Sequence, residues 1–371
     1  MKRRQILLGT IAATLAGLAK SRSVFSANRL SLDAWNALSR DLIIQHRLDP
    51  VYASYVLFAV AVSQAIALAD QSEPTPDSMA DSPGWASLLA LNTLLPKDER
   101  IAALTADYQT DLSAPEHAPI IKAVSRFLQK RINEGAEERM PVVEPTGKDV
   151  WRSLDNRPPL RPTWGTVKYF GIEVDPVAVC PKPFSVGSAD FIQELNTVKT
   201  IAKNASPKQI ESVHYWADTI GTVTPPGHWN QLIEQFLMNR SVSDRIFGLA
   251  LAQIAMFNAG IACWCVKYHY WYPRPSQMDP TMTTHFKVPN FPSFPSGHSC
   301  FSWSVAKSLV IAFPDLSARL TPLAEEASQS RVLGGIHYPM DCSAGKILGS
   351  YIGELTAKQF INLEKVIDRA G

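Results

Sequence analysis

The most constraining feature of this sequence is an apolar stretch of twenty residues, 247–266, whose only polar side chains are Gln253 and Asn258. A stretch of this length and composition is long enough to cross a lipid bilayer. It runs directly into Lys267, however, which is the first of several charged residues that must meet in one site. We therefore predict a central helix buried on all sides in a helical bundle, and not a membrane span.

Three short motifs with cations and histidines follow this stretch. They are Lys267, six residues, Arg274-Pro275; then Pro295-Ser296-Gly297-His298; then Ser330-Arg331, five residues, His337, three residues, Asp341. Nineteen residues separate the first motif from the second, and 31 separate the second from the third. We predict that the three motifs form one pocket for a tetrahedral oxyanion.

The residue types in these motifs suit an anion whose oxygens point in several directions. Arg274 and Arg331 each offer a planar fork of donors, and Lys267 adds a compact point charge. Ser296 offers a hydroxyl donor, and Gly297 lets a backbone N–H approach the anion closely. A helix that begins at Gly297 would add its free N–H groups and its dipole.

The two histidines supply the remaining chemistry. Asp341 follows His337 by four residues, so its carboxylate is placed to orient the imidazole. His337 is then the nucleophile or the ligand. His298 is the general acid/base, because the ordinary pKa of histidine lies near neutrality.

At every signature position, the three motifs resemble the type 2 phosphatidic acid phosphatase and vanadium haloperoxidase superfamily. Residues 262–270, 291–295 and 331–337 are similar to soluble bacterial haloperoxidase-like proteins in particular. Trp264 and Phe291 match positions that border the halide site in the fungal chloroperoxidases of this superfamily. The resemblance implies an all-α fold of helical bundles, haloperoxidase/acid phosphatase-like, with the site in the C-terminal half.

The resemblance implies two activities. In a vanadium-dependent haloperoxidase, His337 would be the vanadate ligand, His298 the acid/base, and Lys267 would polarise bound peroxide. In a soluble acid phosphatase, His337 would form a phosphohistidine and His298 would protonate the leaving group; the 31-residue gap after His298 is typical of secreted acid phosphatases. A non-catalytic phosphate-binding protein, the third hypothesis, would not need both histidines. We take the haloperoxidase as the leading hypothesis, with vanadate as cofactor, or phosphate in the site of a phosphatase.

The N-terminus predicts export. Residues 1–27 begin with three basic side chains, and a short apolar run over residues 6–19 follows that is too short to span a bilayer comfortably. The pair Arg3-Arg4 resembles a twin-arginine signal, although Lys2 departs from that pattern and the usual aromatic residue is missing. A general secretory signal is the alternative. We expect a periplasmic or secreted protein.

Proline content suggests how the rest of the chain is divided. Helical periodicity is expected over residues 28–139 and again over 188–371. Residues 140–187 contain eight prolines, so a long helix is excluded there. We predict an ordered wrap between two helical halves, with a simple linker as the alternative.

Three local predictions concern smaller segments. Residues 71–83 contain three prolines and are predicted to be a loop. Arg126, Lys130 and Arg131 are predicted to form a solvated basic face. His228, in a segment that also resembles the haloperoxidase-like group, either lines the mouth of the pocket or is structural.

Composition narrows the cofactors and partners. The formal charge of +2 is too small to argue for nucleic acid or an anionic membrane. None of the five cysteines forms a CxxC pair, so zinc is not expected. A nucleotide cofactor is not expected either. The expected partners are small molecules, either hydrogen peroxide and halide or a phosphate ester. The oligomeric state stays open, a homo-oligomer included.

Overall fold

The computed structural model describes residues 30–69, 76–108, 113, 115–136, 142–153 and 157–370. Among these residues the regular structure is helical, and the one β-type contact is an isolated bridge between Ile220 and Thr222. The predicted all-α fold is confirmed. The export signal predicted for residues 1–27 lies outside the described residues.

The N-terminal helices pack around α3. They are α2 (Leu32–Gln45), α3 (Pro50–Ala69), α4 (Pro76–Leu94), α5 (Glu99–Asp107) and α7 (Ala118–Arg131), with a 3-10 turn η1 (Pro115–His117) and a π turn η2 (Ile132–Ala136). The side chains of α3 are buried over nearly its whole length, because α4, α7 and the central helix of the second half cover its different faces. This burial requires a helix that is apolar all round.

The start of α4 corrects one prediction. The helix begins at Pro76, so the predicted loop over residues 71–83 is wrong for its second half. Pro83 lies inside the helix. The next residue, Gly84, packs so closely on Trp35 that an added Cβ would lie 2.9 Å from the indole nitrogen. Packing in the tertiary structure overrides the local cost of a proline in a helix here.

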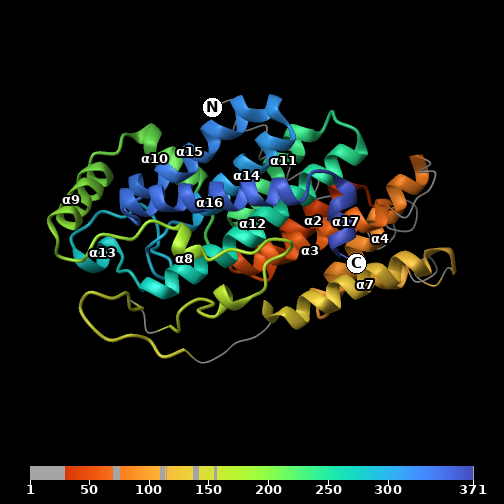
Figure 1. Cartoon of the computed structure of the whole chain (residues 1–371), viewed down its shortest axis with the longest axis horizontal. Helices are drawn as coiled ribbons and strands as arrows, with labels where there is room; N and C mark the ends of the chain where they lie inside the picture. The colour runs from red at the N-terminus through yellow and green to blue at the C-terminus, as the bar shows by residue number, and fades with distance from the viewer. Residues whose placement is uncertain are drawn as a thin grey trace.

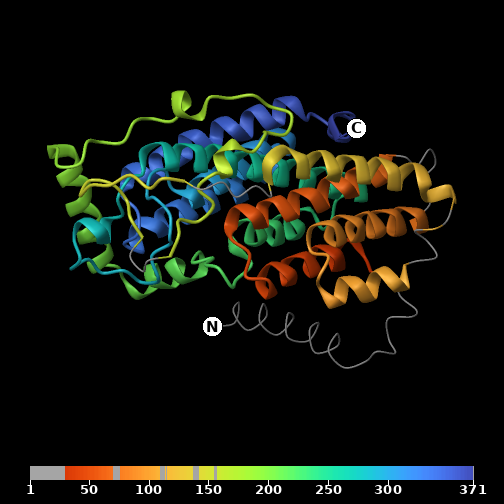
Figure 2. The same ribbon diagram turned by 90° about the horizontal axis from the view of Figure 1, so that it is seen from below.

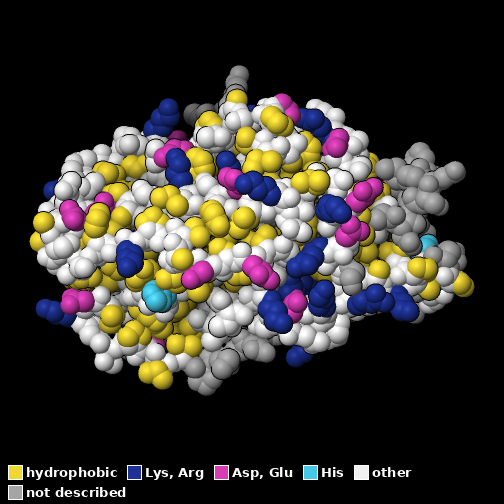
Figure 3. All heavy atoms as spheres, in the orientation of Figure 1, with side chains coloured by type: hydrophobic (Ala, Val, Ile, Leu, Met, Phe, Trp, Pro, Cys, Tyr) yellow, Lys and Arg dark blue, Asp and Glu magenta, His cyan; other side chains and the backbone are white. Residues whose placement is uncertain are grey.

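The predicted solvated basic face, which lies on α7, is wrong for one of its three residues. Arg126 and Lys130 are exposed, and Figure 3 shows Lys and Arg side chains along the edge where α7 lies. Arg131, in contrast, is only 3% exposed and pairs with Glu134. Its guanidinium lies 5.6 Å from the ring centre of Phe170, and burial lowers its pKa to about 10. The predicted solvated face therefore does not include Arg131.

The C-terminal helices include α12 at their centre, against which α11, α14, α16 and α17 pack (Figure 1). They are α9 (Ala189–Lys203), α10 (Pro207–Tyr215), α11 (Thr224–Leu237), α12 (Val242–Tyr270), α13 (Pro275–Met278), α14 (Gly297–Ala312), α15 (Ser317–Leu333), α16 (Pro339–Gln359) and α17 (Leu363–Ala370), with η4 (Pro314–Leu316) before α15. Within residues 247–266, all side chains except Phe247 and Cys265 are buried. The stretch contacts α3 on one side and α14 and α16 on another.

Two segments have the length and apolar character of membrane spans, Pro50–Leu68 and Val242–Met278. Their apolar windows are 100% and 94% buried inside the fold. This is the environment that we predicted for residues 247–266, a helix surrounded by protein. That the chain is not an integral membrane protein stays a prediction.

Residues 142–153 and 157–187 cross the outside of the C-terminal helices largely without regular structure (Figures 1 and 2). They contain only η3 (Trp164–Thr166) and α8 (Pro176–Val179). The carbonyl of Leu160 accepts hydrogen bonds from Trp264 Nε1 at 3.2 Å and from the Tyr268 hydroxyl at 2.7 Å. The segment is thus an ordered wrap. The division at residues 139/140 and 187/188 stays a prediction, since side chains from both halves and the wrap join one core.

Three glycines one turn apart bring α16 close against α14. An added Cβ would lie 2.7 Å from the Ser296 carbonyl oxygen at Gly345 and 2.4 Å from the Cys300 carbonyl oxygen at Gly349. An added Cβ at Gly353 would lie 2.4 Å from the Ser304 carbonyl oxygen. Because α14 begins at the Pro-Ser-Gly-His motif, this contact fixes that motif against the start of α16.

We expect Gly349→Ala to lower the free energy of unfolding by about 1–3 kcal/mol, although alanine favours helix, because the methyl group would overlap the α14 backbone. Urea denaturation measures the change. The matched control is Ser350→Ala, the next residue on the same helix, which is half-buried. Unchanged or increased stability in Gly349→Ala would contradict the close contact.

Candidate active site

The structure brings the three motifs together where several helices begin or end. Lys267 lies in the last turn of α12, Arg274 precedes α13, Ser296, Gly297 and His298 start α14, Arg331 lies in the last turn of α15, and His337 and Asp341 flank the start of α16. The side chains of Lys267, Arg274 and Arg331 are all 0% exposed. Burying three cations is costly unless each has partners or a counter-ion.

Lys267 is bonded entirely to backbone. Its ammonium group donates to the carbonyls of Pro292, Ser293 and Pro295 at 2.8, 2.8 and 2.5 Å. These three bonds use all the hydrogens of the ammonium group. Burial lowers the pKa of Lys267 to about 8. Lys267 therefore holds the loop that precedes α14 and adds positive potential, and direct donation to a ligand would require it to release a carbonyl.

The guanidinium of Arg274 has one nitrogen, Nη2, without a hydrogen-bond partner among the described residues. Its Nε donates to the Phe291 carbonyl at 3.1 Å and its Nη1 to the Ile336 carbonyl at 2.8 Å. Nη1 also lies 3.0 Å from Nε2 of His337. Nη2 is buried and has no hydrogen-bond partner within the part of the chain that the structure describes. Burial lowers the pKa of Arg274 to about 10, so it remains a cation at neutral pH.

The contacts of Arg331 are longer. Nε donates to the Ser330 hydroxyl at 3.0 Å, and Nη2 lies 3.5 Å from the carbonyl of Val213. Nη1 lies 3.3 Å from Nε2 of His298. Since hydrogen bonds beyond about 3.2 Å are weak, two of its nitrogens are available to a better acceptor.

Ser296 and Gly297 form the predicted helix start. Ser296 is the N-cap of α14, and its hydroxyl oxygen accepts from the Ser299 N–H at 3.4 Å. The hydroxyl hydrogen is not used in that bond, so it can be donated to a ligand. The first N–H groups of α14 have no carbonyl partner inside the helix and favour negative charge nearby.

His337 is oriented by a carboxylate, as its spacing predicts. Nδ1 lies 2.8 Å from Oδ2 of Asp341, and the same oxygen accepts from the hydroxyl of Ser293 at 2.6 Å. Nδ1 then carries the hydrogen, and Nε2 presents a lone pair on the side of Arg274. Burial, with Arg274 and Lys267 nearby, holds the pKa of His337 well below its ordinary range. Burial raises the pKa of Asp341 to about 6.

His298 faces two opposite charges. Its Nε2 lies near Arg331, as above, and 3.9 Å from Oδ2 of Asp218. The ring is also hydrogen-bonded to the backbone of Trp216. Burial and the Arg331 charge hold the pKa of His298 well below its ordinary range. His298 is therefore neutral near pH 7 and able to accept a proton.

Sequence reasoning missed Asp218 and Ser293, which stand in loops and in no recognisable spacing. It left His228 between two interpretations. The structure places His228 beside Asp218, with Nδ1 3.0 Å from Oδ2, and 12% of its side chain is exposed. His228 thus lies one carboxylate away from His298 instead of in the pocket itself.

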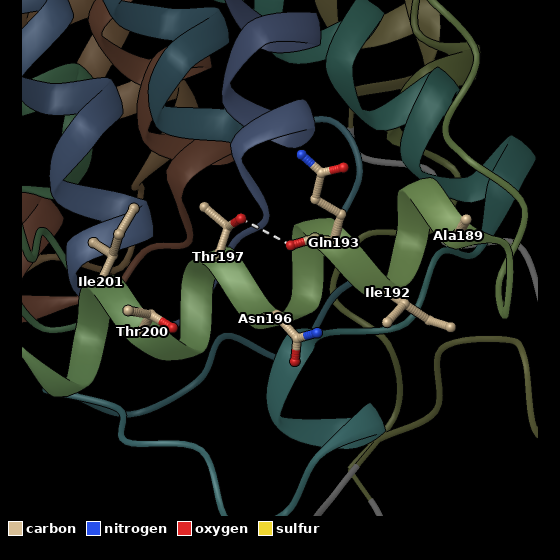
Figure 4. Close-up of a pocket in the computed structure, with 7 residues that line it drawn as sticks. All are labelled: Ala189, Ile192, Gln193, Asn196, Thr197, Thr200 and Ile201. Atoms are coloured by element: carbon tan, nitrogen blue, oxygen red, sulfur yellow. Dashed lines mark hydrogen bonds between the residues drawn. The ribbon is translucent and has the colours of Figure 1, made fainter.

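Trp264 and Phe291 form an apolar wall beside the cations. Their ring centres are 5.1 Å apart. The Lys267 ammonium lies 5.0 Å from the ring centre of Phe291, and the Arg274 guanidinium lies at the same distance. Both rings are buried. A depression on the outer face of α9 (Figure 4) is lined by that helix alone, through residues such as Gln193 and Asn196, and contains none of these groups.

We expect Arg274→Ala and Arg331→Ala each to weaken phosphate and vanadate binding roughly tenfold or more, because each removes a charge-assisted donor from a buried site. Isothermal titration calorimetry on protein purified without phosphate measures the dissociation constants. Arg240→Ala is the matched control, since Arg240 pairs with Asp315 at the surface. Unchanged constants in both site variants would argue against the pocket.

The buried histidines predict how stability varies with pH. The folded-state pKa values of His298 and His337 are depressed from 6.5, so the unfolded chain takes up protons below pH 6.5 that the folded chain does not. Stability is therefore lost as the pH falls below 6.5. Asp341 opposes this loss, because its pKa is raised from 3.8 to about 6 and the folded protein binds its proton first.

Two histidines outweigh one carboxylate, so these three site groups together should lower the free energy of unfolding between about pH 7.5 and about pH 5, while the raised pKa values of Asp41, Glu194 and Glu234 oppose them. His337→Asn, which keeps a donor for Asp341 and removes one titrating ring, should reduce that difference. Urea denaturation at the two pH values tests both statements. Equal pH dependence in the variant and the parent protein would contradict the burial of a neutral His337.

Comparison with known proteins agrees with the superfamily suggested by the motifs. Residues 246–365 match the model of the PAP2 superfamily. An acid phosphatase of Zymomonas mobilis is 38% identical over 65 residues, which are 18% of this chain and 24% of that protein. The chain therefore matches about a quarter of the length of this relative.

Two solved structures share the fold over most of the chain. A bacterial vanadium-dependent iodoperoxidase superposes with a TM-score of 0.73 at 19% identity, covering 90% of this chain and 96% of its own. A holo-type bacterial vanadium-dependent chloroperoxidase gives 0.65 at 14% identity, covering 87% and 93%. Residues 246–365 are thus similar to the PAP2 superfamily, and the chain as a whole has the fold of these bacterial vanadium-dependent haloperoxidases.

Proposed function

We propose that this protein is a vanadate-dependent, haloperoxidase-like enzyme that oxidises halide with hydrogen peroxide. The observation that carries the proposal is the apolar wall of Trp264 and Phe291, packed directly against the buried cations. A weakly hydrated halide is suited to such a place, where a dry wall meets positive charge. The dry wall also strengthens the field of Lys267, because little water screens it.

The residues present fit a tetrahedral oxyanion such as vanadate. Arg274 offers a buried Nη2 without a partner, Arg331 offers nitrogens with long contacts, and Ser296 offers a hydroxyl hydrogen. His337 presents the lone pair of Nε2 to the same side. Vanadate, when bound, supplies the centre that activates hydrogen peroxide toward halide.

The protein's own groups carry out binding and proton transfer. Arg274 and Arg331 offset the charge of the oxyanion, and Asp341 keeps His337 in the tautomer whose Nε2 can be a ligand. His298, neutral at pH 7, takes a proton at Nε2 from hydrogen peroxide and returns it later in the cycle. The burial of these groups excludes bulk water from the reacting atoms.

A soluble acid phosphatase is the alternative, and two observations favour it. One is the local identity with the Zymomonas mobilis acid phosphatase. The other is the 31-residue gap between His298 and Ser330. In this reaction Nε2 of His337 attacks phosphorus as the ester P–O bond breaks, and His298, after taking up a proton from solvent at Nε2, gives that proton to the leaving oxygen. Water then hydrolyses the P–N bond, and His298 takes up the proton that this water releases. Such a site needs an open, wet mouth, whereas His337 is only 2% exposed.

The remaining sequence predictions are part of the same proposal. The basic and apolar residues 1–27 support export to the periplasm or the exterior. The proposed domain division places every site residue within residues 188–371. The substrates are small molecules under either reading.

The activity is tested by two assays on one preparation. We expect halogenation of a phenol dye in the presence of vanadate, bromide and peroxide, inhibited by phosphate because both anions occupy one site. The second assay measures turnover of para-nitrophenyl phosphate. His337→Ala should abolish whichever activity is found, since no other side chain presents an imidazole lone pair beside Arg274.

Ester hydrolysis without vanadate-dependent halogenation, across acid to neutral pH and with chloride, bromide and iodide, would establish the phosphatase instead. Phosphate binding with neither activity would leave the non-catalytic binding protein. Full turnover in His337→Ala would remove both mechanisms.

A further inference from the structure

The turn between α10 and α11 holds a buried carboxylate next to the pocket. Asp218, in this turn, is 8% exposed. Its Oδ2 lies 3.9 Å from Nε2 of His298, and Nη1 of Arg331 lies 3.3 Å from the same nitrogen on another helix. Asp218 and Arg331 thus face the same nitrogen of His298, and the Asp218 charge acts on Arg331 by raising its pKa against the effect of burial.

A different residue holds the carboxylate. His228, on α11, places Nδ1 3.2 Å from Oδ1 and 3.0 Å from Oδ2 of Asp218. These are the hydrogen bonds that Asp218 makes within the described chain. The His228 ring is itself fixed, because it stacks on Trp216 at 4.6 Å between ring centres and meets the edge of Tyr215 at 4.7 Å.

The two possible partners of Asp218 compete. A buried carboxylate needs a hydrogen-bond donor, and a guanidinium is the strongest donor available to it. Two nitrogens of Arg331 make only long, weak contacts, of 3.3 and 3.5 Å. They are therefore able to bind a carboxylate instead. A carboxylate paired there would occupy the nitrogens that the oxyanion needs.

We propose that His228 is a positioning residue that restrains Asp218 and thereby keeps Arg331 free to bind the oxyanion. His228 acts through Asp218 and does not touch the ligand. The inference rests on the proposed oxyanion site, and it holds for vanadate and phosphate alike because both use Arg331.

The test compares His228→Asn with His228→Leu. Nδ2 of asparagine takes the position of Nδ1 in histidine, so His228→Asn keeps a donor for Asp218 and His228→Leu does not. Both variants lose the ring that stacks on Trp216 and any charge on the imidazole. The difference between them therefore isolates the hydrogen bond.

The measurement is the dissociation constant of inorganic phosphate, and then of vanadate, by calorimetry on full-length protein purified without phosphate. We expect His228→Asn to bind like the parent protein and His228→Leu to bind about tenfold more weakly, as its Asp218 turns to Arg331. Adding Asp218→Asn to His228→Leu should restore affinity, because the competing charge is removed. A general loss of structure would not be reversed by a second substitution.

Equal affinity in His228→Asn and His228→Leu would overturn the proposal, as would a double variant that remains as weak as His228→Leu. If His228→Leu does not fold, Asp218→Asn alone decides. It should bind phosphate as tightly as the parent protein or more tightly, and weaker binding would show that the carboxylate supports the site. Absence of phosphate and vanadate binding in the parent protein would instead remove the oxyanion site, and this inference with it.

Discussion

Three cations buried within one region are the constraint on which the rest of this structure depends. Each must be bonded in the absence of a ligand, and the fold meets this need mainly with backbone carbonyls. The Lys267 ammonium donates to three carbonyls of the loop before α14. Arg274 donates to two carbonyls, one through Nε and one through Nη1. Unpaired carbonyls occur in loops and at the ends of helices. This explains why the site lies where helices begin and end.

The precision of the site then depends on packing at a distance from it. The glycines of α16 let the backbone of α14 approach, which sets Ser296 against the start of α16. The wrap fixes Trp264 through the carbonyl of Leu160. The central helix α12 carries Lys267 and Trp264. It also packs against α3, so the N-terminal half helps to hold both side chains in place. The described residues of the N-terminal half thus support the site without contributing a side chain to it.

The sequence predicted contacts that depend on short spacing better than contacts that depend on the fold. His337 and Asp341 lie four residues apart and meet at 2.8 Å, and α14 begins at Gly297. Asp218 could not be found in this way, because only the packing of the α10–α11 turn brings it to His298, 80 positions later. Arg131 looked like a surface residue because the rings that cover it come from distant segments. The roles of the site residues stay proposals, since phosphate and vanadate make the same demands.

The central proposal is that these residues form one oxyanion site, which vanadate and phosphate share. Vanadium-51 NMR of protein purified without phosphate tests this most directly. The claim predicts one broad bound resonance that saturates at about one equivalent per chain and returns to the free signal when phosphate is added. A spectrum that shows only free vanadate at every ratio would contradict it.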